Sequence, residues 1–267
     1  MGPFERAVAF GRHLSELTST RVEAFSWGTA FRNDDFPERW DSNYLMVERP
    51  LETLTPGALA GEADRLLAGL GHREIVINDE TDGDRMAMGL GELGYDGDRL
   101  VVMALVRQAD REPPALDVEE VDLPMVRPLL IEVNRRGHGG MSAGVAETLA
   151  DFKRLLVEQA NARFFLVRVD GEPAGCCELY VRDGVAQIED VNTLTEFRGR
   201  GIARAVVSRA ALEGRAAACD PVFVVADDGD WPKELYRKLG FDPVGRFRSF
   251  VKAPPPASDP PTSRRAR

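Results

Sequence analysis

The sequence predicts an α/β (α+β) protein in which helices flank a mixed central β-sheet. Three observations lead to this prediction. The second half of the chain alternates between apolar runs of strand length and segments with helical spacing. Asp170-Gly171 and Asp183-Gly184 each separate two such runs, which is the signal of a tight hairpin. A strand–helix–strand unit also occurs twice, and hairpins combined with such units require both antiparallel and parallel pairing.

The composition is that of an ordinary globular protein. The chain has 267 residues, of which 43% are hydrophobic and 29% are charged, so wholesale disorder is excluded. With 34 Lys and Arg against 44 Asp and Glu, the formal net charge is −10. This balance argues against a general nucleic-acid binder, which needs a basic face, whereas a cationic substrate would be attracted. The length corresponds to one large domain or two small ones.

The chain carries no sign of a membrane segment or a metal site. No apolar stretch is long enough for a membrane-spanning helix, and residues 1–17 lack the continuous apolar core of a signal peptide. The three cysteines, Cys176, Cys177 and Cys219, form neither a disulfide framework nor a pattern of zinc ligands. We therefore expect no metal, no membrane contact and a reducing, cytoplasmic location.

Two breaks divide the chain. The run DREPP at residues 110–114 is a charged Pro-Pro junction, which cannot continue a helix or a central strand. From residue 253 onward, five prolines and three arginines leave almost nothing to bury. We expect an N-terminal domain over residues 1–112, a second domain over 113–252 and a disordered tail over 253–267.

The first half contains the fewest regular signals. Helical spacing of apolar residues predicts helices over residues 7–17 and 58–70, and a short helix over 86–93. Apolar runs predict strands over 73–78 and 100–107.

The second half opens with a short strand over residues 116–121 and two helices. The first helix, over 124–134, has Val126, Leu129 and Leu130 on one face, and the run GHGG at 137–140 separates it from a second helix over 146–159. Three strands joined by the two Asp-Gly turns follow, over 163–169, 174–181 and 185–193.

The end of the chain repeats a pattern from the first half. A helix over residues 201–217, a strand over 222–225, a helix over 232–239 and a closing strand over 241–251 complete the second half. The run IVINDE at 75–80 matches FVVADD at 223–228, and LGYD at 93–96 matches LGFD at 239–242. A chance similarity between two copies of a common pattern is the simpler explanation, but we favour a degenerate internal duplication.

The most informative segment is DVNTLTEFRGRGIA at residues 190–203, where a strand leads through a glycine turn into a helix. The first N–H groups of a helix have no partners within the helix and lie at the positive end of its dipole. Gly199 and Gly201 let a bulky anion approach this backbone, and Arg198 and Arg200 add positive charge. The segment predicts a pyrophosphate cradle. A purely structural turn is the alternative, and neither a Rossmann fingerprint nor a P-loop is present.

Two motifs in this order resemble the GNAT superfamily of acyl-CoA-dependent N-acyltransferases. The run RGRGIA at 198–203 is similar to the family's (Gln/Arg)-x-x-Gly-x-(Gly/Ala) motif, and LYRKLGF at 235–241 is similar to its Leu-Tyr-x-Lys-x-Gly-Phe segment. The resemblance covers residues 116–252 and implies a GNAT fold.

The resemblance implies roles for several residues. Backbone N–H groups of Gly199, Arg200, Gly201, Ile202 and Ala203 would hold the pyrophosphate of acetyl-CoA, the acyl donor. The main chain of Val191 and Thr193 would pair with the pantetheine arm, although many members of the family have an aliphatic residue in place of Thr193. Tyr236 would be the general acid that protonates the departing thiolate, and a phenol suits this role.

The general base is less defined. Glu189 and Asp190 lie on the strand that would face the coenzyme and the substrate. Because side chains alternate along a strand, only one of them can point at the cleft unless a bulge intervenes. We prefer Asp190, since Val191 and Thr193 are expected to face the helices. Salt bridges to nearby arginines are the alternative role for both carboxylates.

Other candidates have weaker support. His138 lies in the loop between the first two helices of the second half, and Cys176 and Cys177 fall within a strand, where cysteine is usually a small buried hydrophobe. In the first half, Trp27, Trp40, Tyr44 and the pair Asp34-Asp35 are candidates to line a shared substrate cleft, although aromatic residues more often lie in a core.

The first half lacks both motifs. No cradle motif occurs between Thr20 and Ile75, and aligning the two repeats places Leu90 where Tyr236 stands. This half resembles a degenerate GNAT-like domain in tandem with a catalytic one.

The sequence therefore predicts an N-acetyltransferase in which a primary amine attacks the thioester of acetyl-CoA directly. A non-catalytic acyl-CoA sensor and a protein lysine or N-terminal acetyltransferase are the alternatives. The acceptor is left open between a small molecule and a peptide, and the assembly between a monomer and a homodimer.

Overall fold

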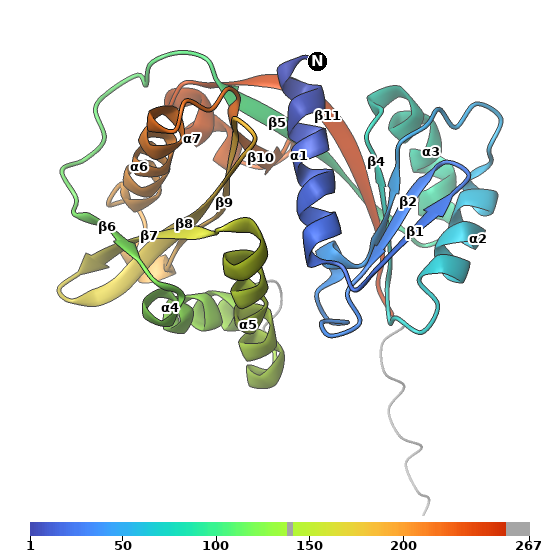
Figure 1. Cartoon of the computed structure of the whole chain (residues 1–267), viewed down its shortest axis with the longest axis horizontal. Coiled ribbons are helices and arrows are strands. Elements are labelled where there is room, and N and C mark those ends of the chain that lie inside the picture. Colours follow the sequence, from blue (N-terminus) through green and yellow to red (C-terminus); the bar gives the residue numbers. More distant parts are fainter. Residues whose placement is uncertain (138–140, 255–267) are drawn as a thin grey trace, which may run out of the picture.

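A single mixed sheet runs through the whole molecule. The computed structural model describes residues 1–137 and 141–254. Within them, eleven strands lie in the order β1-β2-β3-β4-β11-β5-β10-β9-β8-β7-β6. The predicted fold class is confirmed: the sheet is mixed, and helices flank it (Figure 1). The described residues contain no helix that is both long and apolar enough to cross a membrane.

The first half of the chain supplies five strands and three α-helices. In chain order these are α1 (Pro3–Thr18), β1 (Arg21–Phe25), β2 (Gly28–Arg32), the short 3-10 helix η1 (Trp40–Ser42), β3 (Tyr44–Val47), α2 (Pro56–Leu66), β4 (Arg73–Ile77), α3 (Glu80–Glu92) and β5 (Asp96–Leu105). The strands β1, β2 and β3 were not expected from the sequence. The reason is visible in β1, an edge strand whose first four residues are all exposed and therefore show no alternation of apolar and polar positions.

The second half supplies six strands and four α-helices. They are β6 (Val118–Val121), α4 (Leu123–Arg136), α5 (Ala143–Ala160), β7 (Arg163–Val169), β8 (Glu172–Arg182), β9 (Val185–Thr193), the 3-10 helix η2 (Thr195–Phe197), α6 (Ile202–Ala216), β10 (Val222–Asp227), α7 (Pro232–Lys238) and β11 (Phe241–Lys252). All ten elements predicted for this half are present, with small shifts of their ends.

The two halves exchange their last strands. The strand β5 of the first half pairs antiparallel with β10, and β11 of the second half pairs antiparallel with β4. The two exchanged strands also pair with each other, from Phe241 opposite Leu105 to Val251 opposite Asp96. The expected boundary near residue 112 lies in the connection from β5 to β6, but the sheet continues across the two halves.

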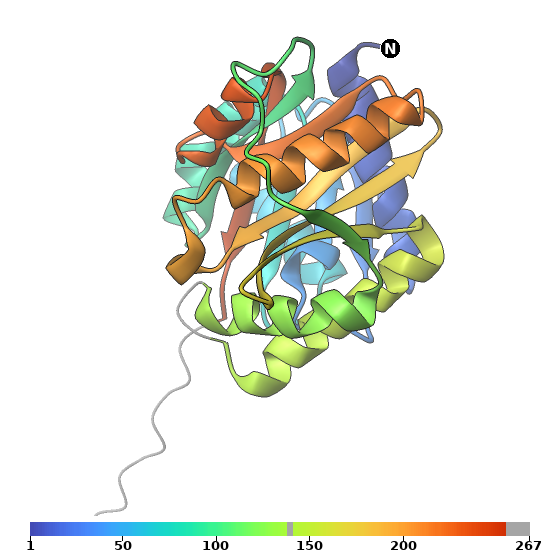
Figure 2. The ribbon, with the colours of Figure 1, turned by 90° about the vertical axis from the view of Figure 1, so that its left-hand side faces the viewer.

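The sheet separates distinct cores. On one face of the second half, α6 and α7 pack on the sheet (Figure 2). On the other face, α1, α4 and α5 cover it, and α1 runs along the junction between the halves (Figure 1). The helices α2 and α3 cover a separate core in the first half. The candidate site lies at the end of β9, between the core under α6 and α7 and the core under α1, α4 and α5.

Candidate active site

The strands β9 and β10 separate at their C-terminal ends. They pair in parallel over only three residue pairs, which end at Val224 opposite Ile188. Beyond this point β9 continues to Thr193, whereas β10 remains paired with β5 as far as Asp227. The parting of the two strands leaves a notch in the sheet, bordered by β9 from Glu189 to Thr193. Of the residues on this border, Glu189 and Asp190 line a cavity on the side of α1 and α5, and Val191 packs against the core on the α6 side.

A β-bulge lies on the border of the notch. Glu178 pairs with Glu189 and Cys176 pairs with Asn192, so two residues of β9, Asp190 and Val191, stand opposite one residue of β8. Asp190 has a positive φ of 48°. A bulge redirects the side chains that follow it. As a result, Glu189 and Asp190 both line the same cavity, which regular alternation would not allow.

Asp190 is held by a buried lysine. Lys153 on α5 is 4% exposed and forms ion pairs with Asp190 and with Glu178, whose Oε1 lies 2.8 Å from the lysine Nζ. Tyr180 donates a hydrogen bond to Glu178. The charge of Lys153 lowers the pKa of Asp190 to about 2. Asp190 is therefore ionised at neutral pH and engaged by its partner.

Glu189 has a different environment. Its partner is the Gln187 side-chain amide, which donates a hydrogen bond, and it forms no ion pair with any described residue. Burial and the neighbouring charge of Asp190 raise the pKa of Glu189 to about 7. This is the range in which a carboxylate exchanges protons most effectively at physiological pH.

Tyr236 lies in the core on the α6 side of the sheet. It is 7% exposed and packs edge-on against Phe241, with ring centroids 6.3 Å apart. Burial, followed by the charge of Glu189, raises the pKa of Tyr236 above its ordinary value. The phenol is therefore protonated at neutral pH, as a proton donor must be.

The predicted cradle is an open helix N-terminus. Gly201 precedes α6 with φ 80°, and no side chain caps the helix. A side chain on Gly201 would come within 2.8 Å of Pro114, whereas the space around Gly199, with φ 78°, is open. Arg200 lies above the ring of Phe197. The first N–H groups of α6 are thus free of side-chain acceptors.

The corresponding helix of the first half is closed to an anion. The Thr55 hydroxyl caps α2 by accepting a hydrogen bond from the Ala58 N–H at 3.2 Å. Pro56, at the start of this helix, has no N–H to offer. Leu90, in the place of Tyr236, is fully buried. The degenerate character of this half stays a prediction.

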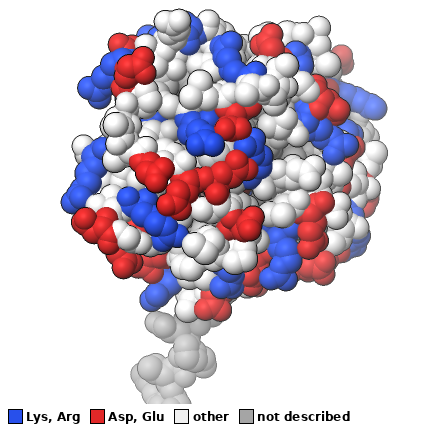
Figure 3. Space-filling view, turned by 60° about the vertical axis from the view of Figure 1, so that its left-hand side comes forward, with Lys and Arg blue, Asp and Glu red and all other residues white. Residues whose placement is uncertain are grey.

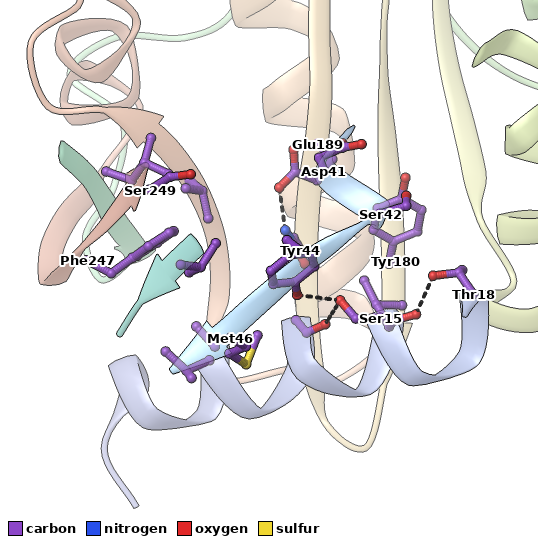
Figure 4. Close-up of a pocket in the computed structure, with 18 of the residues that line it drawn as sticks. Ser15, Thr18, Asp41, Ser42, Tyr44, Met46, Tyr180, Glu189, Phe247 and Ser249 are labelled. Carbon is purple, nitrogen blue, oxygen red and sulfur yellow. Dashed lines mark hydrogen bonds between the residues drawn. The ribbon is translucent and has the colours of Figure 1, made fainter. Parts of the chain in front are cut away.

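A cavity of about 320 Å³ lies between α1, α5 and the sheet, and both halves of the chain line it. We call it the central cavity. Figure 4 shows Glu189 and Tyr180 on one side of it, and Phe247 and Ser249 of β11 on the other. Tyr44 lies between them and forms a 2.7 Å hydrogen bond with Ser15 of α1.

Of the first-half residues expected at a shared cleft, only Tyr44 lines the central cavity. Trp27 packs against the core beneath α2 and α3, and Trp40 stacks on His72 with ring centroids 5.0 Å apart. Asp34 forms ion pairs with Arg21 and Arg32. The expectation that Trp27, Trp40 and the Asp34-Asp35 pair line this cavity is thus wrong, and packing or ion pairs engage the side chains of Trp27, Trp40 and Asp34 elsewhere.

The remaining candidates take no part in the site as described. Cys176 and Cys177 are fully buried, and burial raises the pKa of both thiols. His138 lies outside the described residues. No group of three or more His, Cys, Asp or Glu side chains in residues 1–137 and 141–254 is arranged to hold a metal ion. On the face in Figure 3, acidic and basic side chains are intermixed.

Sequence reasoning missed three charged residues of the site. Lys153 and Glu178 belong to elements read as an amphipathic helix and an apolar strand, and their pairing depends on tertiary contacts. Glu74 also lines the central cavity. The sequence does carry a signal for Glu74, because this carboxylate directly precedes the apolar run IVI at 75–77 in a strand that is buried at this position.

Comparisons with known proteins concern the family and the fold. Residues 134–241 match the model of the acetyltransferase (GNAT) family. No curated protein matches the chain. Several solved structures share the fold over most of its length.

A conserved protein of unknown function from Staphylococcus epidermidis is 17% identical, with a TM-score of 0.68 over 89% of this chain and 95% of that one. A GCN5-related N-acetyltransferase from Kribbella flavida is 16% identical, with a TM-score of 0.61 over 92% and 94%. One from Sphaerobacter thermophilus is 17% identical, with a TM-score of 0.55 over 81% and 75%. At these identities the likeness concerns the fold, which extends over both halves.

Proposed function

Because residues 134–241 match the model of the GNAT family of acetyltransferases, we propose that this chain transfers an acetyl group from acetyl-CoA to a primary amine held in the central cavity. The observation that carries the proposal is the notch between β9 and β10. An uncapped helix N-terminus follows β9 on one side of it, and a cavity containing an unpaired carboxylate lies on the other. Donor and acceptor can therefore meet within the sheet.

The donor is assigned to the α6 side. The N–H groups from Gly199 to Ala203 would bind the pyrophosphate, and Arg198 and Arg200 would add charge. The open space around Gly199 supports this assignment, since a diphosphate needs close access to the backbone. The main chain of Val191 and Thr193 would bind the pantetheine arm, which fits a strand that has lost its parallel neighbour.

The chemistry is assigned to two groups on opposite sides of the notch. Glu189 takes a proton from the ammonium form of the acceptor, and the neutral nitrogen attacks the thioester carbonyl. As the C–N bond forms and the C–S bond breaks, Tyr236 donates a proton to the departing thiolate, and the second proton lost by the new amide nitrogen returns the tyrosinate to its neutral form. Asp190 was the base we preferred from the sequence, but its ion pair with Lys153 favours Glu189. In this proposal Asp190 acts as a fixed charge that maintains the basicity of Glu189.

The central cavity favours a small acceptor over a protein lysine. Helix α1 covers it along the junction of the halves, and its volume of about 320 Å³ is at the lower end of the range for small-molecule sites.

Calorimetric titration with acetyl-CoA tests the donor site. We expect micromolar binding that a Gly199→Glu variant loses, because the new carboxylate would occupy the cradle. The control is Gly69→Glu, which introduces the same charge at a positive-φ glycine with equally open surroundings in the first half.

Release of free coenzyme A with a panel of amines then separates enzyme from sensor. Donor binding without release for any amine would favour the sensor. If acetyl-CoA binds neither the native protein nor the control, the cradle is only a structural turn and the proposal fails.

A further inference from the structure

The central cavity contains a second carboxylate, far from Glu189. Glu74 on β4 is 9% exposed and lines this cavity. Its Oε1 accepts a hydrogen bond from the Ser249 hydroxyl of β11 at 3.0 Å. Among the described residues it forms no ion pair. A carboxylate that is buried in this way is costly unless a cation or further donors satisfy it.

The two carboxylates lie at opposite ends of the cavity. The strand order β4-β11-β5-β10-β9 places three strands between Glu74 and Glu189. With roughly 4.8 Å between neighbouring strands, the four steps from β4 to β9 correspond to about 19 Å measured along the sheet, perpendicular to the strands. The cavity-lining side chains on the intervening strands are largely apolar and comprise Leu100, Val102, Phe223, Val225 and Phe247. Figure 4 shows Ser249 and Phe247 on the side opposite Glu189.

The other acidic side chains of the cavity already have partners. Asp190 is paired with Lys153, and Asp41 is paired with Arg39 at 2.9 Å. Arg39 in turn lies over the ring of Phe152, 4.2 Å from its centroid. Glu74 and Glu189 are thus the two carboxylates lining the cavity that have no cationic partner among the described residues.

The pKa values of both unpaired carboxylates are raised, and for the same main reason. Burial is the main cause that raises the pKa of Glu74 to about 7, with a smaller contribution from Asp41. The pKa of Glu189 is raised to the same value, also mainly by burial. A bound cation at either place would favour the ionised carboxylate and would gain a charge-assisted hydrogen bond.

We propose that the acceptor is a linear dication, a diamine or polyamine in which an apolar segment separates two cationic nitrogens. One nitrogen is acetylated beside Glu189, and the other binds Glu74 and Ser249. This inference rests on the proposed function, because it names the substrate class of the same site. A monoamine with a neutral tail would leave Glu74 buried beside an apolar chain, which is unfavourable.

The test compares kcat/KM for α,ω-diamines of increasing length with kcat/KM for the monoamine of each length. We expect the native protein to prefer diamines once the chain spans the cavity. In Glu74→Gln, the ratio of diamine to monoamine kcat/KM should fall roughly 10–100-fold, as for loss of a hydrogen bond to a charged group. Ser249→Ala should reduce the same ratio less and serves as a second variant if Glu74→Gln does not fold.

Asp98→Asn is the matched control. Asp98 is exposed on β5 opposite Ser249, does not line the cavity and contributes to the electrostatic environment of Glu74. This control should keep the native ratio. Equal kcat/KM for diamines and monoamines in the native protein would overturn the inference while leaving the proposed function intact. A ratio unchanged in both Glu74→Gln and Ser249→Ala would also overturn it. Absence of coenzyme A release with every amine would instead contradict the proposed function.

Discussion

Glu189 and Asp190 are neighbours in sequence, but their pKa values are shifted in opposite directions. The bulge directs both toward the central cavity, and of these two carboxylates only Asp190 forms an ion pair with Lys153. Asp190 is consequently ionised throughout the neutral range, whereas Glu189 has a pKa of about 7, which suits a base that works at neutral pH. Two adjacent carboxylates whose environments separate their pKa values are a recurrent way to assign different roles to the same side-chain chemistry.

Asp190→Asn should change the pH dependence of the reaction. The groups around Glu189 are Gln187 and Asp190 of β9, Glu178 of β8, Lys153 of α5 and, across the notch, Tyr236 of α7. Removing the Asp190 charge lowers the pKa of Glu189, and Lys153 then acts on it with less compensation. In the proposed mechanism activity requires ionised Glu189, so the acidic limb of kcat/KM should move to lower pH, by on the order of one pH unit. The measurement is a pH–rate profile with a saturating donor.

Two variants control this experiment. Glu189→Gln should lower kcat by about 10²–10⁴-fold and remove the acidic limb. Tyr236→Phe should lower kcat over a similar range and leave the acidic limb near its native position, because Tyr236 is a minor influence on Glu189. An Asp190→Asn profile that coincides with the native one would show that Asp190 does not tune the base. Native activity in Glu189→Gln would remove Glu189 from the mechanism.

At the scale of residues, the sequence predicts the cradle and the pair of carboxylates but not their division of labour. The cradle is readable because its glycines, arginines and helix start are contiguous. Lys153 and Glu178 lie 25 residues apart, on a helix and a strand, so their contact follows from the fold and not from a motif. The preference for Asp190 assumed regular alternation, which the bulge removes.

At the scale of elements, the repeated Leu-Gly-aromatic-Asp run corresponds to a repeated structure. Gly94 and Gly240 stand just before the exchanged strands β5 and β11, with φ of 86° and 97°. Both glycines have the left-handed conformation that ends a helix and redirects the chain. The repeated Leu-Gly-aromatic-Asp run therefore marks two equivalent turns. The strands β1 to β3 are not predicted from the sequence, because they lack an alternation of apolar and polar residues and no run in the second half of the chain matches them.

The two glycines should differ in their tolerance of a side chain. A Cβ on Gly240 would lie 2.2 Å from the Arg107 carbonyl oxygen, whereas on Gly94 its nearest neighbour would be the end of the Lys252 side chain at 3.8 Å. Gly94→Ala should lower the free energy of unfolding by about 1–2 kcal/mol, the cost of the left-handed conformation. Gly240→Ala should cost about 3 kcal/mol or more, because a backbone clash is added. Urea unfolding measures both, and equal losses would contradict the predicted clash.

At the scale of the molecule, the exchange of β5 and β11 makes the two halves interdependent. The sequence predicts two units of similar plan and a junction between them. It does not predict the exchange, because β5 could satisfy the same apolar pattern beside β4 or beside β10. The exchange brings β4 and β9 to the two ends of one cavity. In the proposed function, the first half, in which no cradle motif occurs between Thr20 and Ile75, thereby contributes one wall of the acceptor site, the acceptor wall.

The exchange also predicts that the halves unfold together. Removing β11 from the sheet would expose edges of β4 and β5 at once, so neither half can lose its structure while the other keeps its own. Tryptophan fluorescence can observe each half separately. Trp231→Phe leaves Trp27 and Trp40 to report on the first half, and the double variant Trp27→Phe/Trp40→Phe leaves Trp231 to report on the second. We expect each variant to show one urea transition whose midpoint agrees with that of its own far-ultraviolet circular dichroism. Within either variant, a fluorescence midpoint that differs from the circular dichroism midpoint would mean that the halves are independent, and that the shared sheet does not couple the donor site to the acceptor wall.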